Sequence, residues 1–301
     1  MRSKLTLCLV LIAFAAAPSY AWHAEGHARA AHEAVTILPA DLPEFFRQGA
    51  VTIEQDSSEP DLFTKPIAPP ELAAAEAPEH YFDMELFELK ELPADRYKFL
   101  HLLFQKDIEP YKIGLLPYAL AEWTDRLAVA FAEHRKWPDD PEVQKKALVY
   151  AGILAHYAGD ACMPLHTTIH HDGKLEPGKP AVKGIHRQVD ALLGKLPLKL
   201  ALDIDNGSIL PADKLQEFIA AQLQQSHALV EPLYAMEAQL PAYEQPLRPQ
   251  GPVFDFAKER LQASAIFIAR LYATAWAKSK DITIPDWHHR PITYPKDVNA
   301  K

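Results

Sequence analysis

Histidine and aspartate residues at regular spacings are the part of this sequence most able to carry out chemistry. The chain contains 14 histidines among its 301 residues. His156 and Asp160 stand four residues apart, so on a helix both side chains would lie on one face, and His166 follows where the chain can turn back. His186 and Asp190 repeat the same spacing. Imidazole and carboxylate groups are ligands that suit Zn²⁺, so these five residues are candidate metal ligands.

Spacing alone leaves the role of these pairs open. In a chain with 14 histidines, chance should produce about one histidine with an aspartate four residues later. Two pairs, one of them extended by a third candidate ligand, exceed that expectation only slightly. Metal ligands and ordinary ion-paired or helix-capping histidines are therefore both compatible with the spacing.

Four residues nearer the N-terminus are also candidates, although each has an ordinary structural interpretation. Trp22 would fit in a hydrophobic core, and His27 would fit in the first turn of a helix. Asp61 stands in an acidic segment and would fit as a turn or capping residue, and His80 would fit as a half-buried histidine. Their order along the chain is more informative than their types.

The order of these residues resembles the superfamily of zinc-dependent phospholipases C and single-strand-specific nucleases of the S-one/P-one type. The resemblance extends from Trp22 to about Lys280. The family pattern is a Trp at the mature N-terminus, an early His, an Asp, a His, then His-x3-Asp-x5-His and Gly-x-His-x3-Asp/Glu. The stretch from Gly159 to His166 is similar to the family's Gly-Asp-x-x-Gln-Pro-Leu-His, with Met163 in place of Gln. The matching residues are Trp22, His27, Asp61, His80, His156, Asp160, His166, Gly184, His186 and Asp190.

The resemblance implies three zinc ions per chain, held by residues from the whole length of the sequence. The implied ligands of the first ion are Asp61, His80, His156 and Asp160. Those of the second are His166, His186 and Asp190, with solvent. Those of the third are the free amino group and carbonyl of Trp22, with His27 and Asp160, so that Asp160 bridges two metals. The nuclease branch usually has Trp-Ala-Asp where this chain has Glu-Pro-Asp, so Asp56 is the alternative to Asp61.

The activity that the resemblance implies is hydrolysis of phosphoric esters by zinc-activated hydroxide, with Asp61 and Asp160 as catalytic residues. The first interpretation is a nuclease whose partner is single-stranded DNA or RNA, or a 3′-nucleotide. The Trp22-x4-His27 spacing and an Asp at position 190 are typical of that branch. Tyr81 and Phe82 are candidates for stacking on bases or for ordinary core packing.

Two alternatives belong to other classes of function. A phospholipase C acting on phosphatidylcholine-like lipids is favoured by the run from His80 to Asp83, which is similar to that branch's His-Phe-Tyr-Asp. Leu62, where that branch has a tyrosine, argues against a choline pocket. The other alternative is a zinc-stabilised binding protein without catalysis. In each case we expect a monomer with no stable membrane anchor.

The N-terminal residues are typical of a secretory signal peptide. Arg2 and Lys4 precede an apolar run over residues 5–17, and cleavage is expected after Ala21, so the protein is expected to be secreted or periplasmic. Losing those two basic residues would change the formal net charge from −9 to −11. An acidic surface repels nucleic acid unless bound cations reverse the charge locally. Cleavage would also leave Cys162 as the one cysteine, predicted to be a buried free thiol.

Helices must position these residues, because the apolar residues recur with helical periodicity and show little strict alternation. The 26 prolines and 11 glycines are typical of helices joined by stiff loops. The predicted helices cover 26–38, 97–104, 115–134, 141–160, 185–193, 215–239 and 254–280, and the predicted loops cover 54–78, 166–184 and 240–252. The predicted fold class is an all-α single-domain multi-helix bundle around a trinuclear zinc cluster.

The chain is expected to comprise one domain flanked by two short segments. Residues 1–21 would be the signal peptide, 22–285 the zinc-dependent phosphodiesterase domain and 286–301 a C-terminal tail. His170 and His171 are expected in a solvated loop, and His288 and His289 on the surface of the tail.

Overall fold

The computed structural model describes residues 22–175, 183–202, 204, 205, 207 and 209–290. Within these residues the chain forms α-helices and short 3-10 helices, and it forms no β-strand. The prediction of an all-α fold is therefore confirmed. The expected signal peptide lies outside the described residues.

The chain forms a few long helices and many much shorter ones. The α-helices are α1 (Ala24–Thr36), α2 (Glu44–Gln48), α3 (Ala50–Asp56), α4 (Glu59–Thr64), α5 (Pro70–Glu76), α6 (Arg96–Gln105), α7 (Leu116–Lys136), α8 (Pro141–Ala161), α9 (Ile185–Asp190), α10 (Leu215–His227), α11 (Val230–Ala235) and α12 (Pro252–Lys278). The 3-10 helices are η1 (Ala77–His80), η2 (Leu89–Glu91), η3 (Pro110–Lys112), η4 (Pro164–Thr167), η5 (Leu193–Lys195), η7 (Glu237–Gln239) and η8 (Ser279–Asp281).

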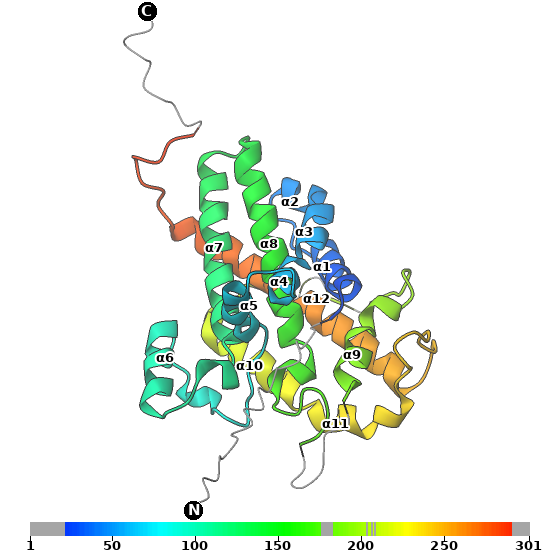
Figure 1. Cartoon of the computed structure of the whole chain (residues 1–301). Coiled ribbons are helices and arrows are strands. Elements are labelled where there is room, and N and C mark those ends of the chain that lie inside the picture. Colours follow the sequence, from blue (N-terminus) through cyan, green and yellow to red (C-terminus); the bar gives the residue numbers. More distant parts are fainter. Residues whose placement is uncertain (1–21, 176–182, 203, 206, 208, 291–301) are drawn as a thin grey trace, which may run out of the picture.

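Helix α8 is the central element of the fold. It lies beside α7, and α1, α3 and α12 also pack against it (Figure 1). The carboxylate of Asp140 accepts hydrogen bonds from the backbone N–H groups of Glu142 and Val143, at 2.9 and 3.3 Å, and so caps the start of the helix. Pro141 suits the first turn, where no backbone donor is needed. From this start α8 extends through the core to Ala161.

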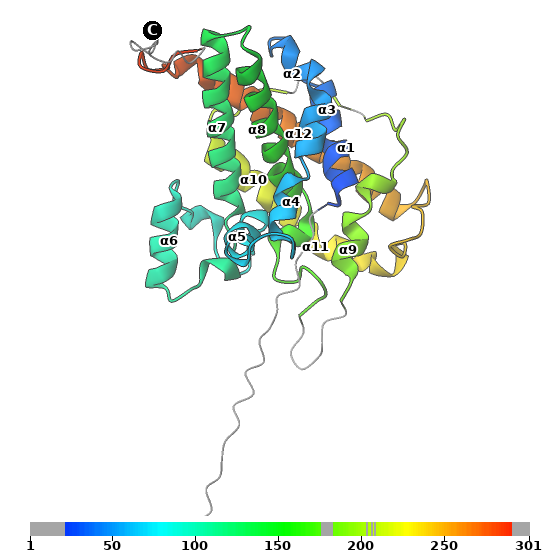
Figure 2. The ribbon, with the colours of Figure 1, turned by 45° about the horizontal axis from the view of Figure 1, so that its top comes forward.

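Short helices cover the face of α8 that carries His156 and Asp160. Figures 1 and 2 both show α4 crossing α8 between α5 and α1. Helix α3 comes so close to α8 that a Cβ atom at Gly152 would lie 2.5 Å from the Cβ of Asp56. Glycine at this position therefore permits the close packing that places α3 and α4 over this face.

The prediction of a continuous loop over residues 54–78 is wrong. This segment contains the end of α3, all of α4 and α5, and the start of η1. Pro60 and Pro70 each stand in the first turn of a helix, with Glu59 and Glu71 beside them. Proline and acidic residues favour the first turn of a helix. Pro60 and Pro70 therefore begin helices here and do not form a loop.

The prediction of one helix over residues 215–239 is also wrong. The structure divides it into α10, α11 and η7, with the break at residues 228–229. Pro232 lacks a backbone donor, and its ring would clash with the carbonyl of Ala228 in a continuous helix. The break follows from this one residue.

The described part of the C-terminal tail lies against α7. Oε2 of Glu133 on α7 lies 3.2 Å from a guanidinium nitrogen of Arg290 and 3.7 Å from Nε2 of His288. Residues 291–301 lie outside the described residues, so the domain boundaries remain predictions. No helix in the described ranges is long and apolar enough to cross a membrane.

Candidate metal centre

Residues from six elements meet beside the C-terminal half of α8. Helix α1 contributes His27, α4 contributes Asp61, η1 contributes His80, α8 contributes His156 and Asp160, η4 contributes His166, and α9 contributes His186 and Asp190. These side chains form three groups, and within each group the metal-binding N and O atoms lie within 4.8 Å of one another. The groups are His80, His156 and Asp160; His166, His186 and Asp190; and His27, Asp61 and His156. Each group has donors that suit zinc, and ligation by these residues remains a prediction.

The first group is held together by contacts between its own side chains. Nδ1 of His80 lies 3.1 Å from Oδ2 of Asp160 and 3.0 Å from Nε2 of His156. Nδ1 of His156 lies 2.8 Å from the backbone carbonyl of Ser57, to which it can donate a hydrogen bond. In neutral His156 this leaves Nε2 as a lone-pair donor directed at Asp160 and His80, which is how an outer hydrogen bond orients a metal-binding imidazole.

The second group has the same construction. Nδ1 of His166 contacts the carbonyl of His80. Nδ1 of His186 contacts the carbonyl of His171 at 3.0 Å. In the neutral tautomers that donate these bonds, both Nε2 atoms are acceptors, and they lie 3.2 Å apart. Nitrogen atoms at this separation can both bind one metal ion. Oδ2 of Asp190 lies 3.4 Å from Nε2 of His186 and adds a negative charge.

The third group brings α1 onto α8. The rings of His27 and His156 stack with their centroids 4.0 Å apart, and Nε2 of His27 lies 3.5 Å from Oδ1 of Asp160. A Cβ atom at Gly159 would lie 2.8 Å from Nδ1 of His27, so a larger residue would displace this ring. His27 is fully buried, and burial lowers its pKa well below the usual value. Its neutral imidazole suits metal binding.

Trp22 is anchored beside this group and is fully buried. Its indole N–H donates to the carbonyl of Gly159 at 2.9 Å, and the next residue, His23, donates its backbone N–H to the carbonyl of Asp190 at 3.2 Å. The resemblance implies that Trp22, His27 and Asp160 share a metal. It also implies that Asp61 belongs with His80, His156 and Asp160, whereas the structure groups Asp61 with His27 and His156. Nε2 of His27 lies 3.5 Å from Oδ1 of Asp160.

Asp61, and not Asp56, is the early aspartate that lies with the histidines. Asp56 packs against Gly152, one turn of α8 before His156, and belongs to none of the three groups. Asp61 stands in the first turn of α4 and has the ammonium of Lys65 at 3.5 Å from its Oδ1. A short helical turn, rather than an extended loop, therefore carries this carboxylate inward.

The electrostatics of the cluster favour bound cations. Burial, together with the charges of Asp61 and Asp160, raises the pKa of Asp190 well above its usual value. Neither carboxylate oxygen of Asp190 accepts a hydrogen bond from the described residues. Burial acts against charge on His80, but its contacts with Asp160 and Glu76 raise its pKa to about 10. Without metal the cluster retains protons, and divalent cations would neutralise the same carboxylates.

Sequence reasoning missed two residues, Glu76 beside His80 and Asp172 beside His186. Glu76 stands four residues before His80 in sequence, with Oε1 at 3.6 Å from Nε2 of His80, and it also accepts the hydroxyl hydrogen bond of Tyr157. The four-residue spacing was the signal that could have identified it. Asp172 contacts the backbone of His186, and no local spacing points to that contact.

Burial and hydrogen bonding bear on several other residues that the sequence analysis considered. Phe82 is fully buried in the core, which supports core packing rather than contact with substrate. Tyr81 donates its hydroxyl to the carbonyl of Tyr111. His171 is exposed as expected, but its carbonyl contacts the ring of His186. Cys162 is a buried free thiol, as predicted.

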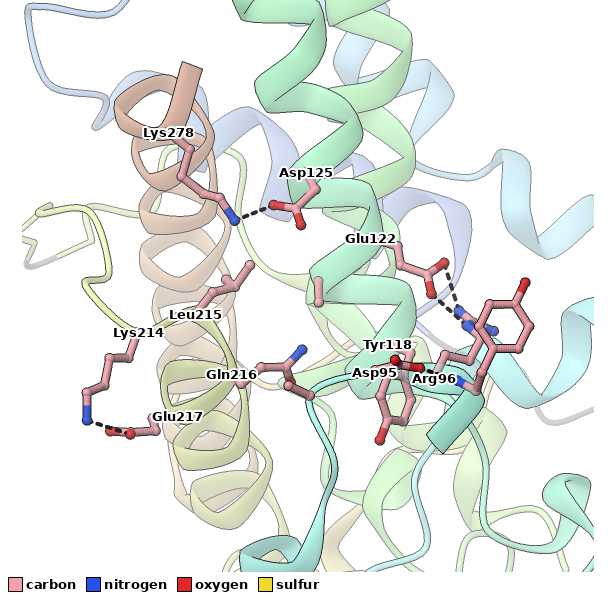
Figure 3. A pocket seen from close by; sticks show the side chains of 13 residues that line it. Asp95, Arg96, Tyr118, Glu122, Asp125, Lys214, Leu215, Gln216, Glu217 and Lys278 are labelled. Carbon is pink, nitrogen blue, oxygen red and sulfur yellow. Dashed lines mark hydrogen bonds and ion pairs between the residues drawn. The ribbon is translucent and has the colours of Figure 1, made fainter. Parts of the chain in front are cut away.

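A separate groove of about 600 Å³ lies between α6, α7, α10 and the end of α12. Figure 3 shows that its charged side chains pair with one another: Asp125 with Lys278, Lys214 with Glu217, and Glu122 with Arg96. None of the candidate metal ligands lines it. The carboxylate of Asp95, which also lines the groove, accepts the first N–H groups of α6. The buried cluster is therefore the candidate functional site.

Comparison with known proteins gives similar solved structures, two of which are described here. No family model matches the sequence, and no curated protein matches it. The alpha-toxin of Clostridium perfringens, isolated from avian strain SWCP, is 14% identical, with a TM-score of 0.45 over 88% of this chain and 65% of its own. The alpha toxin of Clostridium absonum is 14% identical, with a TM-score of 0.44 over 86% of this chain and 64% of its own. The chain thus spans less than two thirds of either toxin.

Proposed function

We propose that this chain is a zinc-dependent hydrolase of phosphoric esters. The observation that supports this most is the second group, where Nε2 of His166 and Nε2 of His186 lie 3.2 Å apart beside the buried carboxylate of Asp190. Backbone carbonyls fix the opposite nitrogen of each ring. Buried imidazole and carboxylate donors held in this way suit a divalent cation.

Within this proposal, zinc would supply an activated water and would neutralise the charge of a phosphate group. The protein's part is to hold the ligands. His156, His166 and His186 each present Nε2, because Nδ1 is engaged by a carbonyl. Asp160 contacts histidines of two groups and would link their positions. Oδ1 of Asp61 contacts the ammonium of Lys65 at 3.5 Å, and within this proposal the carboxylate of Asp61 would orient the water.

A phospholipid is the substrate class that we favour. Of the two aromatic residues considered for stacking on bases, Phe82 is buried in the core and does not reach a substrate. The exposed apolar side chains of the segment that carries Asp61 are aliphatic, with Leu62 46% and Ile67 79% exposed. Aliphatic side chains suit acyl chains and offer no stacking surface for a base.

A nuclease is the second candidate, because the Trp22-x4-His27 spacing and Asp190 match that branch of the resembled superfamily. The deciding experiment offers the zinc-loaded protein, starting at Trp22, four substrates in parallel: phosphatidylcholine vesicles, single-stranded DNA, RNA and a 3′-nucleotide. We expect release of phosphocholine, its loss with chelator and its return with zinc. Cleavage of nucleic acid alone would establish the nuclease, and full zinc with no hydrolysis would leave a binding protein.

A further inference from the structure

The loop that follows η4 contacts the metal-binding helix α9 at two places. Oδ1 of Asp172 accepts hydrogen bonds from the backbone N–H groups of Gly184 and His186, at 2.7 and 3.2 Å. The adjacent carbonyl of His171 accepts the Nδ1 hydrogen bond of His186 at 3.0 Å. Both the peptide and the ring of His186 are therefore fixed by two consecutive residues of this loop.

Helix α9 depends on this loop because its own start is weak. It has six residues, and the residue before it, Gly184, has a φ of 110° and supplies no side-chain cap. A carboxylate that accepts hydrogen bonds from the first N–H groups of a helix stabilises that end. Asp172 supplies this carboxylate from twelve residues upstream of Gly184.

The loop is in turn fixed to α11. The hydroxyl of Tyr234 donates to the carbonyl of His170 and accepts the backbone N–H of Gly173 at 3.0 Å. The two bonds bracket Asp172 on both sides. The position of Asp172 is therefore set by a rigid contact with a neighbouring helix, which is what a positioning role requires.

We propose that Asp172 is a positioning residue that directs Nε2 of His186 into the second metal group. The inference rests on the proposed function, because it assumes that His166, His186 and Asp190 bind zinc. Without the carboxylate, the first turn of α9 would lose its two acceptor contacts. Nε2 of His186 would then no longer be held beside Nε2 of His166.

The test compares zinc affinity in Asp172→Ala, Asp172→Asn and a matched control, Asp95→Ala. Asp95 also caps a helix, with Oδ1 accepting from the N–H groups of Tyr97 and Lys98 at 2.8 and 3.1 Å, but α6 carries no candidate ligand. Zinc content is measured at a buffered free zinc concentration, alongside the absorption spectrum of the cobalt-substituted protein and the Tm of each metal-free variant.

We expect Asp172→Ala to weaken one zinc site by about 10–100-fold, as is typical for an outer-shell residue, with the other zinc ions retained. Asp172→Asn should restore that affinity because its amide oxygen can accept the same bonds. Tyr234→Phe should weaken the same site to a smaller extent. Asp95→Ala should lower the Tm of the metal-free protein comparably and leave zinc affinity unchanged.

Wild-type zinc affinity in Asp172→Ala, or an asparagine variant as weak as the alanine variant, would overturn the positioning role. A wild-type protein that binds no zinc would overturn both this inference and the proposed function. A protein that binds zinc but hydrolyses no phosphoric ester would overturn only the proposed function, since the comparison at Asp172 is read from zinc affinity.

Discussion

At the scale of single residues, the candidate site depends on which nitrogen of each histidine is available. The carbonyls of Ser57, His80 and His171 engage Nδ1 of His156, His166 and His186, respectively. His80 is oriented the other way, with Nδ1 toward Asp160 and Nε2 toward Glu76. The same residue type thus presents different atoms to the cluster, according to its neighbours.

Asp160 is expected to be more sensitive to substitution than any other candidate ligand. It lies 3.5 Å from His27, 3.1 Å from His80 and 3.4 Å from His156, so it links two groups. Asp160→Asn should lose at least one zinc and reduce hydrolysis by more than the about 10–100-fold typical of outer-shell residues. Elemental analysis and kcat measure this. The exposed His289→Ala should change neither, and an Asp160→Asn protein with wild-type zinc and rate would show that the ligand assignment is wrong.

Asp83 predicts a pH dependence of stability. Burial, with the charge of Glu85, raises its pKa to about 8. Between about pH 4 and pH 8 the folded chain therefore holds a proton that the unfolded chain releases. Its stabilising contribution is complete below that range and is lost as the pH rises through about 8.

Asp83→Asn should abolish this dependence, because the amide stays neutral. The difference in Tm between variant and wild type should become more favourable to the variant as the pH rises from 5 to 9. Substitution of the exposed Glu71 by Gln is the control. A difference that is constant with pH would contradict the prediction.

At the scale of elements, α8 combines ligands and glycines on one side. Gly152 admits α3, and Gly159, seven residues later, admits His27 and Trp22. His156 and Asp160 stand at neighbouring positions of the same side. Close approach of other elements and presentation of ligands are therefore two properties of one helix face.

Gly159→Ala should reduce zinc binding although alanine is the better helix former. Helix propensity alone would stabilise the variant by about 1 kcal/mol. The added Cβ would lie 2.8 Å from Nδ1 of His27, so the ring of His27 must move. We expect a lower Tm and a loss of about one zinc, measured by thermal unfolding and elemental analysis. A more stable variant with full zinc content would contradict this.

At the scale of the whole molecule, the core contains buried carboxylates and imidazoles whose burial a bound metal ion would offset. His27, His156, Asp160 and Asp190 are essentially inaccessible to solvent. Buried polar groups without partners destabilise a fold, and a ligand that binds only the folded state stabilises it. Stability and metal content should therefore change together.

Removal of metal should lower the Tm by about 10 °C or more. For a domain of this size, each kcal/mol lost from the free energy of unfolding lowers the Tm by about 2–4 °C. Cys162 provides a second measurement, since it is fully buried and burial raises the pKa of its thiol to about 12. It should not react with a thiol reagent in the zinc-loaded protein and should react slowly after chelation. An unchanged Tm and an unreactive thiol in chelator would argue against structural metal.

The sequence by itself determined the local geometry of this protein. The i, i+4 pairs His156–Asp160 and His186–Asp190 lie on single helix faces because the helix period requires it, and the all-α class followed from the same periodicity. Only the tertiary structure decided which aspartate joins the histidines and which carbonyls orient their rings. Asp61 reaches the cluster because α3 packs closely on Gly152, and the carbonyl of Ser57 meets His156 across 99 residues of sequence. Contacts of that separation depend on how helices pack, and no local spacing encodes them.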